Sequence, residues 1–205
     1  LYGDLDNDTL VGSDGTDLLS GNQGNDSLNG NIGNDTVYGG QGNDTVRGGK
    51  DNDSLFGDKG NDALYGDLGN DTLFGGPDLD LMFGDQGPEA NFGGAGNDFL
   101  FGNEGDDTLF GLGGNDLLSG NQGDDSINGN MGLDTIFGGL GNDTIRGGMQ
   151  NDLLFGDKGS DVLFGDLGAD TLTGDIKGEV FTDIFVVGRV TGASTKTTGG
   201  PNRPD

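Results

Sequence analysis

Glycine recurs every nine residues without a gap from Gly3 to Gly165, and this period constrains the fold of the 205-residue chain more than any other feature. Residues 3–173 divide into 19 units of nine, of which GGQGNDTVR, residues 39–47, is a regular example. Position 1 is Gly in all 19 units and position 4 is Gly in 15. Position 6 is Asp in 18 units, and position 8 is Leu, Ile, Val or Met in 18. Such self-similarity is typical of stacked repeat architectures.

The residue types at each position predict the local structure of a unit. Gly at positions 1 and 4, with Asn or Asp frequent at positions 2 and 5, suits left-handed or otherwise open backbone. We therefore expect positions 1–6 to form a turn and positions 7–9 a three-residue strand, with position 8 on one face and positions 7 and 9 on the other. Two units make one coil of 18 residues. The sequence predicts an all-β fold, a right-handed parallel β-roll whose two parallel sheets enclose the position-8 side chains.

The composition excludes several classes of function. The chain has no His and no Cys, so it cannot build a zinc site, a His-based catalytic triad, a Cys nucleophile, an iron–sulfur centre or a disulfide. Its formal net charge of −27 makes nucleic acids and anionic membranes poor partners and cations good ones. No run of 18 apolar residues is present, so no transmembrane helix is expected. We find no candidate catalytic residues and expect no enzyme activity.

Three other interpretations of the aspartates are weaker. An EF-hand loop is suggested by Asp4, Asp6 and Asp8, but its sixth position is Thr9 instead of Gly and its twelfth is Gly15 instead of Glu. Paired carboxylates can hydrolyse glycosides, but Asp at one equivalent position in 18 units favours a structural ligand. An acidic disordered tail would not require an aliphatic residue every ninth position.

The repeat resembles the RTX, or hemolysin-type, calcium-binding nonapeptide GGxGxDxUx of secreted bacterial proteins. The resemblance covers 171 of the 205 residues. It implies a calcium-loaded parallel β-roll in which each ion lies between turns of successive coils, bound by position-6 carboxylates and turn carbonyls. The candidate ligands are Asp8, Asp17, Asp26, Asp35, Asp44, Asp53, Asp62, Asp71, Asp80, Asp98, Asp107, Asp116, Asp125, Asp134, Asp143, Asp152, Asp161 and Asp170.

The charge of the predicted roll supports calcium binding independently. Position-6 carboxylates would stack along each edge, and neighbours about 5 Å apart repel by roughly 1 kcal/mol even at the dielectric constant of water. The 19 units give 17 neighbour pairs, 9 along one edge and 8 along the other, so up to about 17 calcium ions are expected. Hard oxygen ligands in flexible geometry favour Ca²⁺ over Mg²⁺. We expect the calcium-free chain to be largely unfolded, so that calcium binding supplies the free energy of folding.

A longer repeat overlies the nonapeptide. GNQGNDSLNGN at residues 21–31 recurs as GNQGDDSINGN at residues 120–130, and Arg47 recurs as Arg146. The offset of 99 residues is 11 units, and since 11 is odd, duplicated side chains are expected on opposite sheets.

Two units between these blocks, residues 75–92, match the repeat worst. They are either a fusion scar, a former array end now embedded in the chain, or the result of ordinary drift. A scar predicts a weakened calcium site near Glu89 and a poorly filled core near Asn91.

Position 9 holds 11 of the 15 aromatic residues and should point outward. Alternation predicts one exposed ladder of Tyr38, Phe56, Phe74, Phe92 and Phe110, and on the other sheet Tyr65, Phe83 and Phe101. These ladders are either an interaction face for another roll, another protein or a glycan, or stacks that stabilise their own sheet. Ice binding, another role in the family, would favour Thr in the turns, and position 3 contains none.

The predicted organisation is a β-roll at residues 1–173, a closing strand at 174–187 and a flexible tail at 188–205. The closing segment, DIFVV at residues 183–187, is similar to the DxFxV segment that often follows the last repeat in the family. The chain begins without Met and shows no recognisable type I secretion signal, so we expect it to be a piece of a longer protein.

Two functions fit the sequence. The first is a calcium-dependent structural or interaction module of a secreted or cell-surface bacterial protein, such as an adhesin, matrix, surface-layer or filament component. Extracellular calcium would fold it, and low cytosolic calcium would keep it unfolded for export. The alternative is the calcium-binding secretion and folding module of a larger type I-secreted enzyme or toxin.

Overall fold

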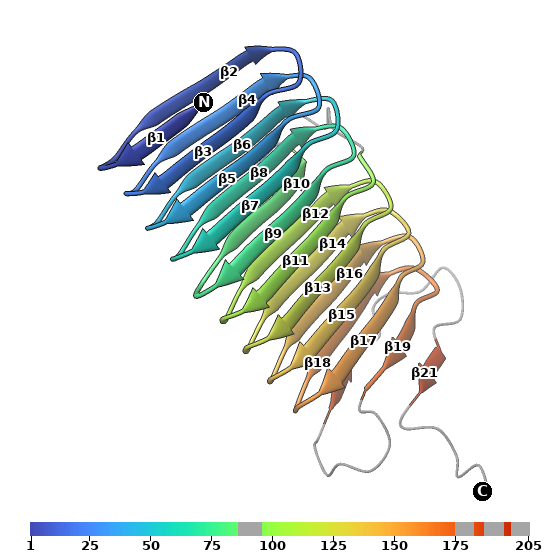
Figure 1. The fold of residues 1–205 in the computed structure, drawn as a ribbon. Helices are drawn as coiled ribbons and strands as arrows, with labels where there is room; N and C mark the ends of the chain where they lie inside the picture. Colours follow the sequence, from blue (N-terminus) through green and yellow to red (C-terminus); the bar gives the residue numbers. More distant parts are fainter. Residues whose placement is uncertain (86–95, 175–182, 187–194, 198–205) are drawn as a thin grey trace, which may run out of the picture.

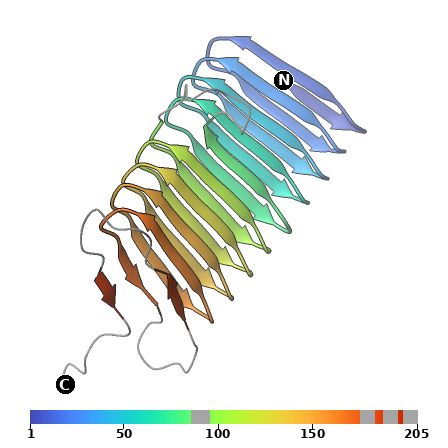
Figure 2. The ribbon, with the colours of Figure 1, turned by 180° about the vertical axis from the view of Figure 1, so that it is seen from behind.

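The described part of the chain is a solenoid of parallel strands. The computed structural model describes residues 1–85, 96–174, 183–186 and 195–197. Successive strands alternate between two sheets that face each other, so each turn of the solenoid contributes one strand to each sheet, as Figures 1 and 2 show from opposite sides. The described residues contain no helix, and therefore no helix that could span a membrane. The all-β parallel roll of about 18 residues per turn is confirmed.

The 11-stranded sheet contains the odd-numbered strands in sequence order. These are β1 (Tyr2–Leu5), β3 (Leu18–Gln23), β5 (Thr36–Gln41), β7 (Ser54–Lys59), β9 (Thr72–Pro77), β11 (Phe99–Glu104), β13 (Leu117–Gln122), β15 (Thr135–Leu140), β17 (Leu153–Lys158), β19 (Thr171–Thr173) and β21 (Thr195–Thr197).

The 10-stranded sheet contains the even-numbered strands, also in sequence order. These are β2 (Thr9–Asp14), β4 (Ser27–Ile32), β6 (Thr45–Lys50), β8 (Ala63–Leu68), β10 (Leu81–Asp85), β12 (Thr108–Gly113), β14 (Ser126–Met131), β16 (Thr144–Met149), β18 (Val162–Leu167) and β20 (Ile184–Val186).

Most strands are six residues long and extend beyond the predicted three. They run from position 7 of one unit to position 3 of the next, so the turn is shorter than expected. Position 2 has positive φ, for example 79° at Asn31, but it still lies in register with its neighbours. The strand bends there, because Asn, Asp and Gly tolerate left-handed backbone.

The core is a row of apolar side chains, one from each of the strands β2 to β19. Leu10 is 7 % exposed, and the other described position-8 side chains, from Leu19 to Leu172, are at most 1 % exposed. Position 9 alternates to the outer face, as predicted. Each of these side chains therefore packs between the two sheets.

The register skips nine residues in the middle of the roll. Neighbouring strands from β1 to β19 are otherwise 18 residues apart, but β9 pairs with β11, and β10 with β12, at an offset of 27. The predicted weak calcium site at Glu89 and core defect at Asn91 fall on residues outside the described ranges. The core position of this coil is taken by Leu100, whose side chain is fully buried.

The sequence explains why the unit that begins at Gly84 does not continue the register beyond Asp85, the last residue of β10. Position 5 of a coil donates its backbone N–H to the position-5 side chain of the coil before it, and Pro88 has no N–H. Asn91 would bring an amide to the apolar core position. The next unit supplies both groups, since Asn97 N–H donates to Asn70 Oδ1 over 2.8 Å and Leu100 fills the core.

The roll continues past the last regular unit. Asp161 N–H donates to Asp183 Oδ1 over 3.2 Å, as it would to a position-6 Asp, and Phe185 packs against the core. The strand β20 lies within the segment where a closing strand is predicted. A flexible tail is predicted from residue 188, but Thr195–Thr197 form β21, which pairs with β19 because the last strand of a sheet offers a free edge.

The register skip generates a prediction about deletions. Removing residues 86–94 joins Asp85 to Ala95 and creates the regular unit GDAGNDFLF, ending at Phe101. We expect this variant to unfold in urea, in the presence of calcium, at the same concentration as the parent chain or higher.

A deletion of equal length provides the control. Removing residues 104–112 also joins two regular half-units, but it deletes Leu109 from the core and should lower the unfolding free energy by about 2–4 kcal/mol. Equal destabilisation by the two deletions would contradict the skipped register.

Candidate metal centres

The position-6 aspartates form two continuous rows, one along each edge of the roll. Each lies at the turn immediately before a strand, and its backbone N–H donates to Oδ1 of the equivalent Asp in the next coil. Asp44 N–H donates to Asp62 Oδ1, and Asp62 N–H to Asp80 Oδ1, both over 2.8 Å. In each row, the Oδ1 atom of each Asp therefore holds its own turn at a fixed spacing from the turn of the coil before it.

The skip changes which aspartates belong to each row. Asp71 N–H donates to Asp98 Oδ1 over 2.8 Å, and Asp80 N–H to Asp107 Oδ1 over 2.7 Å. Strict alternation of 19 units predicts different neighbours, and that prediction is wrong. The first row is Asp8, Asp26, Asp44, Asp62, Asp80, Asp107, Asp125, Asp143, Asp161 and Asp183, and the second is Asp17, Asp35, Asp53, Asp71, Asp98, Asp116, Asp134, Asp152 and Asp170.

The second carboxylate oxygen is the unusual feature of these rows. In many of the aspartates Oδ2 is buried and accepts no hydrogen bond from the protein. These are Asp8, Asp17, Asp26, Asp35, Asp44, Asp53, Asp62, Asp80, Asp107, Asp125, Asp134, Asp143 and Asp152. A buried carboxylate oxygen without a donor is costly, so repetition of this feature along both edges fits a row of cation sites.

Backbone carbonyls border the same space. A Cβ atom placed on Gly39 would lie 2.6 Å from Asp44 Oδ2 and 2.7 Å from the carbonyl oxygen of Gly57 in the next coil. This close approach explains the invariant Gly at position 1, whose φ is not positive at any described unit. Position 4 is Gly for another reason, because its φ is positive in most described units, for example 138° at Gly24.

Burial disfavours the ionised form of these carboxylates. It raises the pKa of Asp62 and of Asp125 to about 7, although the backbone N–H of the preceding Asp opposes the shift. The neighbouring charge of Asp44 raises the pKa of Asp62 further. Burial raises the pKa of Asp80 to about 8. Near neutral pH the rows therefore require protons or cations to become stable.

The donor set fits calcium. It consists of carboxylate and carbonyl oxygens with no nitrogen or sulfur ligand, which is the chemistry that Ca²⁺ prefers. Among the described residues, no three acidic side chains meet at one point. An ion here would therefore take one or two carboxylates and complete its shell with backbone carbonyls.

Position 5 has a role that the sequence did not reveal. Asn25 N–H donates to Asn7 Oδ1 over 2.8 Å, and Asn43 N–H to Asn25 Oδ1 over 2.9 Å. We expected Asn at this position to favour left-handed backbone, but none of the described position-5 residues has positive φ. The side chains instead form hydrogen-bonded rows outside the aspartate rows. Frequent Asn at position 5 is the sequence signal for these rows, but Asn is also common in turns, so the signal does not distinguish the two roles.

Comparison with known families agrees with this chemistry. The family model described as RTX calcium-binding nonapeptide repeat (4 copies) matches residues 2–37, 29–64, 38–73, 56–88, 92–118, 110–145 and 146–176. The chain belongs to the RTX calcium-binding repeat family. The matches leave only residues 89–91 uncovered between 2 and 176, next to the skipped register. A search of curated proteins found no match. RTX repeats bind calcium, and the β-roll they form is a structural calcium-binding module.

The aromatic ladders of this RTX roll differ from the predicted ones. Phe74 stacks on Phe101, with ring centroids 5.2 Å apart, and Phe83 stacks on Phe110 at 5.1 Å. The predicted order, which placed Phe92 between Phe74 and Phe110, is wrong because the register skips nine residues. Phe92 lies outside the described residues. The remaining members, Tyr38 and Phe56 on one sheet and Tyr65 on the other, stack as predicted.

The aromatic rings are less exposed than the predicted ladders would be if their rings did not stack. The stacked aromatics at position 9 are all half-buried, because each ring covers the face of its neighbour. Stacking in parallel, offset geometry is itself favourable. These contacts support the interpretation that the ladders stabilise their own sheets.

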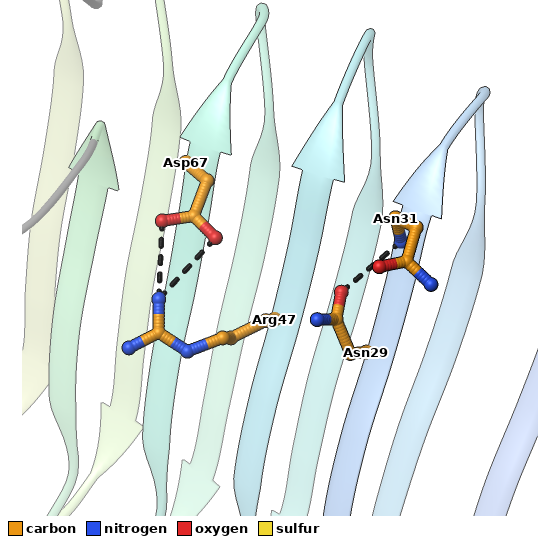
Figure 3. Close-up of polar contacts among 4 residues, drawn as sticks. All are labelled: Asn29, Asn31, Arg47 and Asp67. Carbon is orange, nitrogen blue, oxygen red and sulfur yellow. Dashed lines mark hydrogen bonds and ion pairs between the residues drawn. The ribbon is translucent and has the colours of Figure 1, made fainter. Parts of the chain in front are cut away.

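Duplicated residues lie on the same sheet of the RTX roll, not on opposite sheets. Arg47 of β6 stacks its guanidinium 4.1 Å from the ring centroid of Tyr65 and pairs with Asp67 at 3.2 Å, as Figure 3 shows for the ion pair. Arg146 of β16 repeats this contact over Phe164 at 4.1 Å. Both strands belong to the 10-stranded sheet. The skipped unit turns an offset of 11 units into ten, which is even.

The buried oxygens generate a prediction of opposite effects. Asp125→Asn keeps an acceptor for the N–H of Asp107 but removes the charge that burial disfavours. We expect it to raise the unfolding free energy of the calcium-free chain by about 1 kcal/mol at pH 8 and to weaken calcium binding. The gain of β signal by circular dichroism in chelator at pH 8 measures the first effect, and a calcium titration measures the second.

The neighbouring residue supplies the control. Asp124→Asn removes the same charge from an exposed position-5 side chain, which accepts a hydrogen bond from Asn142 N–H and can still do so as Asn. Both effects should be small in this variant. If Asp125→Asn left calcium affinity unchanged, the row would not be a calcium site.

Proposed function

We propose that each calcium ion lies between successive position-6 aspartates of one row, and that the bound ions make this chain a calcium-dependent structural or interaction module. The observation that carries the proposal is the repeated buried Oδ2 atom without a protein donor. The 18 predicted aspartates are the proposed ligands, and the continuation of the first row suggests that Asp183 joins them. The number of ions, up to about 17, remains a prediction.

The proposed setting is a secreted or cell-surface bacterial protein, such as an adhesin, matrix, surface-layer or filament component. Extracellular modules work with calcium dissociation constants of about 10⁻⁴–10⁻³ M, a concentration far above that of the cytosol. A chain that folds only in this range would stay unfolded until export. The fold is a solenoid, and we propose no catalytic residue in it. Both features suit a spacer or scaffold.

The alternative function is a secretion and folding module of a larger enzyme or toxin. The repeat array would serve equally well there, since folding driven by calcium is independent of what precedes it. Sequence upstream of Leu1 in the gene discriminates the two, because a protease, lipase or toxin domain favours the alternative. Further repeats or adhesive domains favour the first function.

The outer faces are the proposed route to partners. The ladder residues are half-buried and so remain accessible in part: Tyr38, Phe56, Phe74 and Phe101 on one sheet, and Tyr65, Phe83 and Phe110 on the other. The candidate partners are a second roll, another protein or a glycan.

A calcium titration tests this function. We expect far-ultraviolet circular dichroism to gain β signal cooperatively between about 0.1 and 1 mM calcium. Light scattering on the same sample reports whether copies associate. Saturation at micromolar calcium would contradict an extracellular module, because the chain would then already be folded in the presence of cytosolic calcium.

A further inference from the structure

Two equivalent hollows lie on the outer face of the 11-stranded sheet. The first has a volume of about 630 Å³ and lies around Ser20, Tyr38 and Gly40. The second has a volume of about 500 Å³ and lies around Ser119, Phe137 and Gly139. Every residue that lines the second hollow is 99 positions after a residue that lines the first. Because the register skips one unit, the two hollows lie on the same face.

Each hollow begins at a Ser where the aromatic ladder lacks one ring, and the ring on one side of that Ser, Tyr38 or Phe137, lines it. Ser119 of β13 lies in register between Phe101 of β11 and Phe137 of β15. Ser20 of β3 lies in the same way between Tyr2 and Tyr38. The stacked rings elsewhere in the ladders are 4.7–5.2 Å apart. Two strand spacings, about 9.6 Å, therefore separate the rings on either side of each Ser, which leaves room for one inserted ring.

The surroundings of each gap are polar and ordered in the same way. Ser20 Oγ donates to Asn22 Oδ1 over 3.1 Å, and Ser119 Oγ donates to Asn121 Oδ1 over 3.2 Å. The amide of each Asn is therefore held beside the gap. Gly40 and Gly139 leave the backbone next to the ring uncovered, and a Gln follows each Asn on the same strand.

The gap has the chemistry of a sugar site. A pyranose has two faces that can pack on aromatic rings and a rim of hydroxyl groups that amides and backbone groups can bind. Each hollow is lined by one Asp and one Lys, Asp58 with Lys59 and Asp157 with Lys158, so the charges of its lining balance and favour a neutral ligand over an anionic one. A neutral sugar ring with a rim of hydroxyl groups fits both the aromatic side chains and the balanced charge of the lining.

We propose that the ring gaps at Ser20 and Ser119 are paired binding sites for pyranose rings of a neutral polysaccharide. The gaps are five coils apart along the axis of the roll, about 24 Å at the strand spacing. One extended polysaccharide reaches both, and binding at the first gap raises the effective concentration at the second. The inference rests on the proposed interaction role of the outer face and assigns its ligand.

Affinity electrophoresis in the presence of calcium tests the proposal. The probes are soluble dextran, amylose, a mixed-linkage β-glucan and a galactomannan, with alginate as an anionic comparison. We expect at least one neutral polysaccharide to retard the chain. Retardation by alginate alone, or by none of these polymers, overturns the proposal.

Ring-filling variants locate the site. Ser20→Phe with Ser119→Phe completes the ladder, so the variant should fold as well as the parent chain and lose affinity by tenfold or more, on the order expected when both linked sites are lost. The affinity of each single variant should lie between that of the parent chain and that of the double variant. The control is Asn29→Phe with Asn128→Phe, which adds rings at the same position of the opposite sheet and should leave retardation unchanged.

The remaining outcomes are also decisive. Retardation that survives the ring-filling variant overturns the site. Scattering without polysaccharide that disappears in this variant assigns the gaps to a second copy and overturns the ligand. Circular dichroism in calcium separates the two proposals, because a chain that folds with calcium but binds no neutral polysaccharide retains the proposed function and loses only this inference.

Discussion

Two rows of buried carboxylates, each with one oxygen committed to the next coil, are the constraint on which the rest of the structure depends. The bond from Asp44 N–H to Asp62 Oδ1 sets how closely two turns approach. That spacing requires Gly at position 1, where Oδ2 and a carbonyl crowd the Cα atom. The core adds one apolar side chain from each of the strands β2 to β19, so the free energy of the fold depends heavily on how the charge of these rows is neutralised.

The repeat period predicted much of the fold and the composition of the candidate site. A nine-residue period with one aliphatic fixes a two-strand coil, and 18 aspartates at one position identify the candidate ligands. The ladder order and the sheet of Arg146 were predicted wrongly for one reason. Counting units assumes that each unit forms half a coil, whereas Pro88 and Asn91 make one unit unsuitable for the coil, and its place is taken by Asn97, Asp98 and Leu100.

Other features needed three-dimensional information. Asp183 follows Gly174 by nine positions instead of five, so its membership in an aspartate row appears only from its bond with Asp161. The Asn rows at position 5 and the ring gaps at Ser20 and Ser119 depend on which residues become neighbours across coils. Each of these is a relation between residues 18 or more positions apart, which a pattern within one unit does not contain.

In this account, calcium neutralises the negative charge of the two aspartate rows. The most direct test of that claim is circular dichroism of the calcium-free chain, in the presence of a chelator, between pH 8 and pH 5. Burial raises the folded pKa of Asp62 to about 7 from a usual value of 3.8, so the folded chain binds more protons than the unfolded chain between these values. Stability without calcium should therefore fall as pH rises through this window. The account predicts a largely unfolded chain at pH 8 and a gain of β signal on acidification. Full β signal in chelator at pH 8 would contradict it.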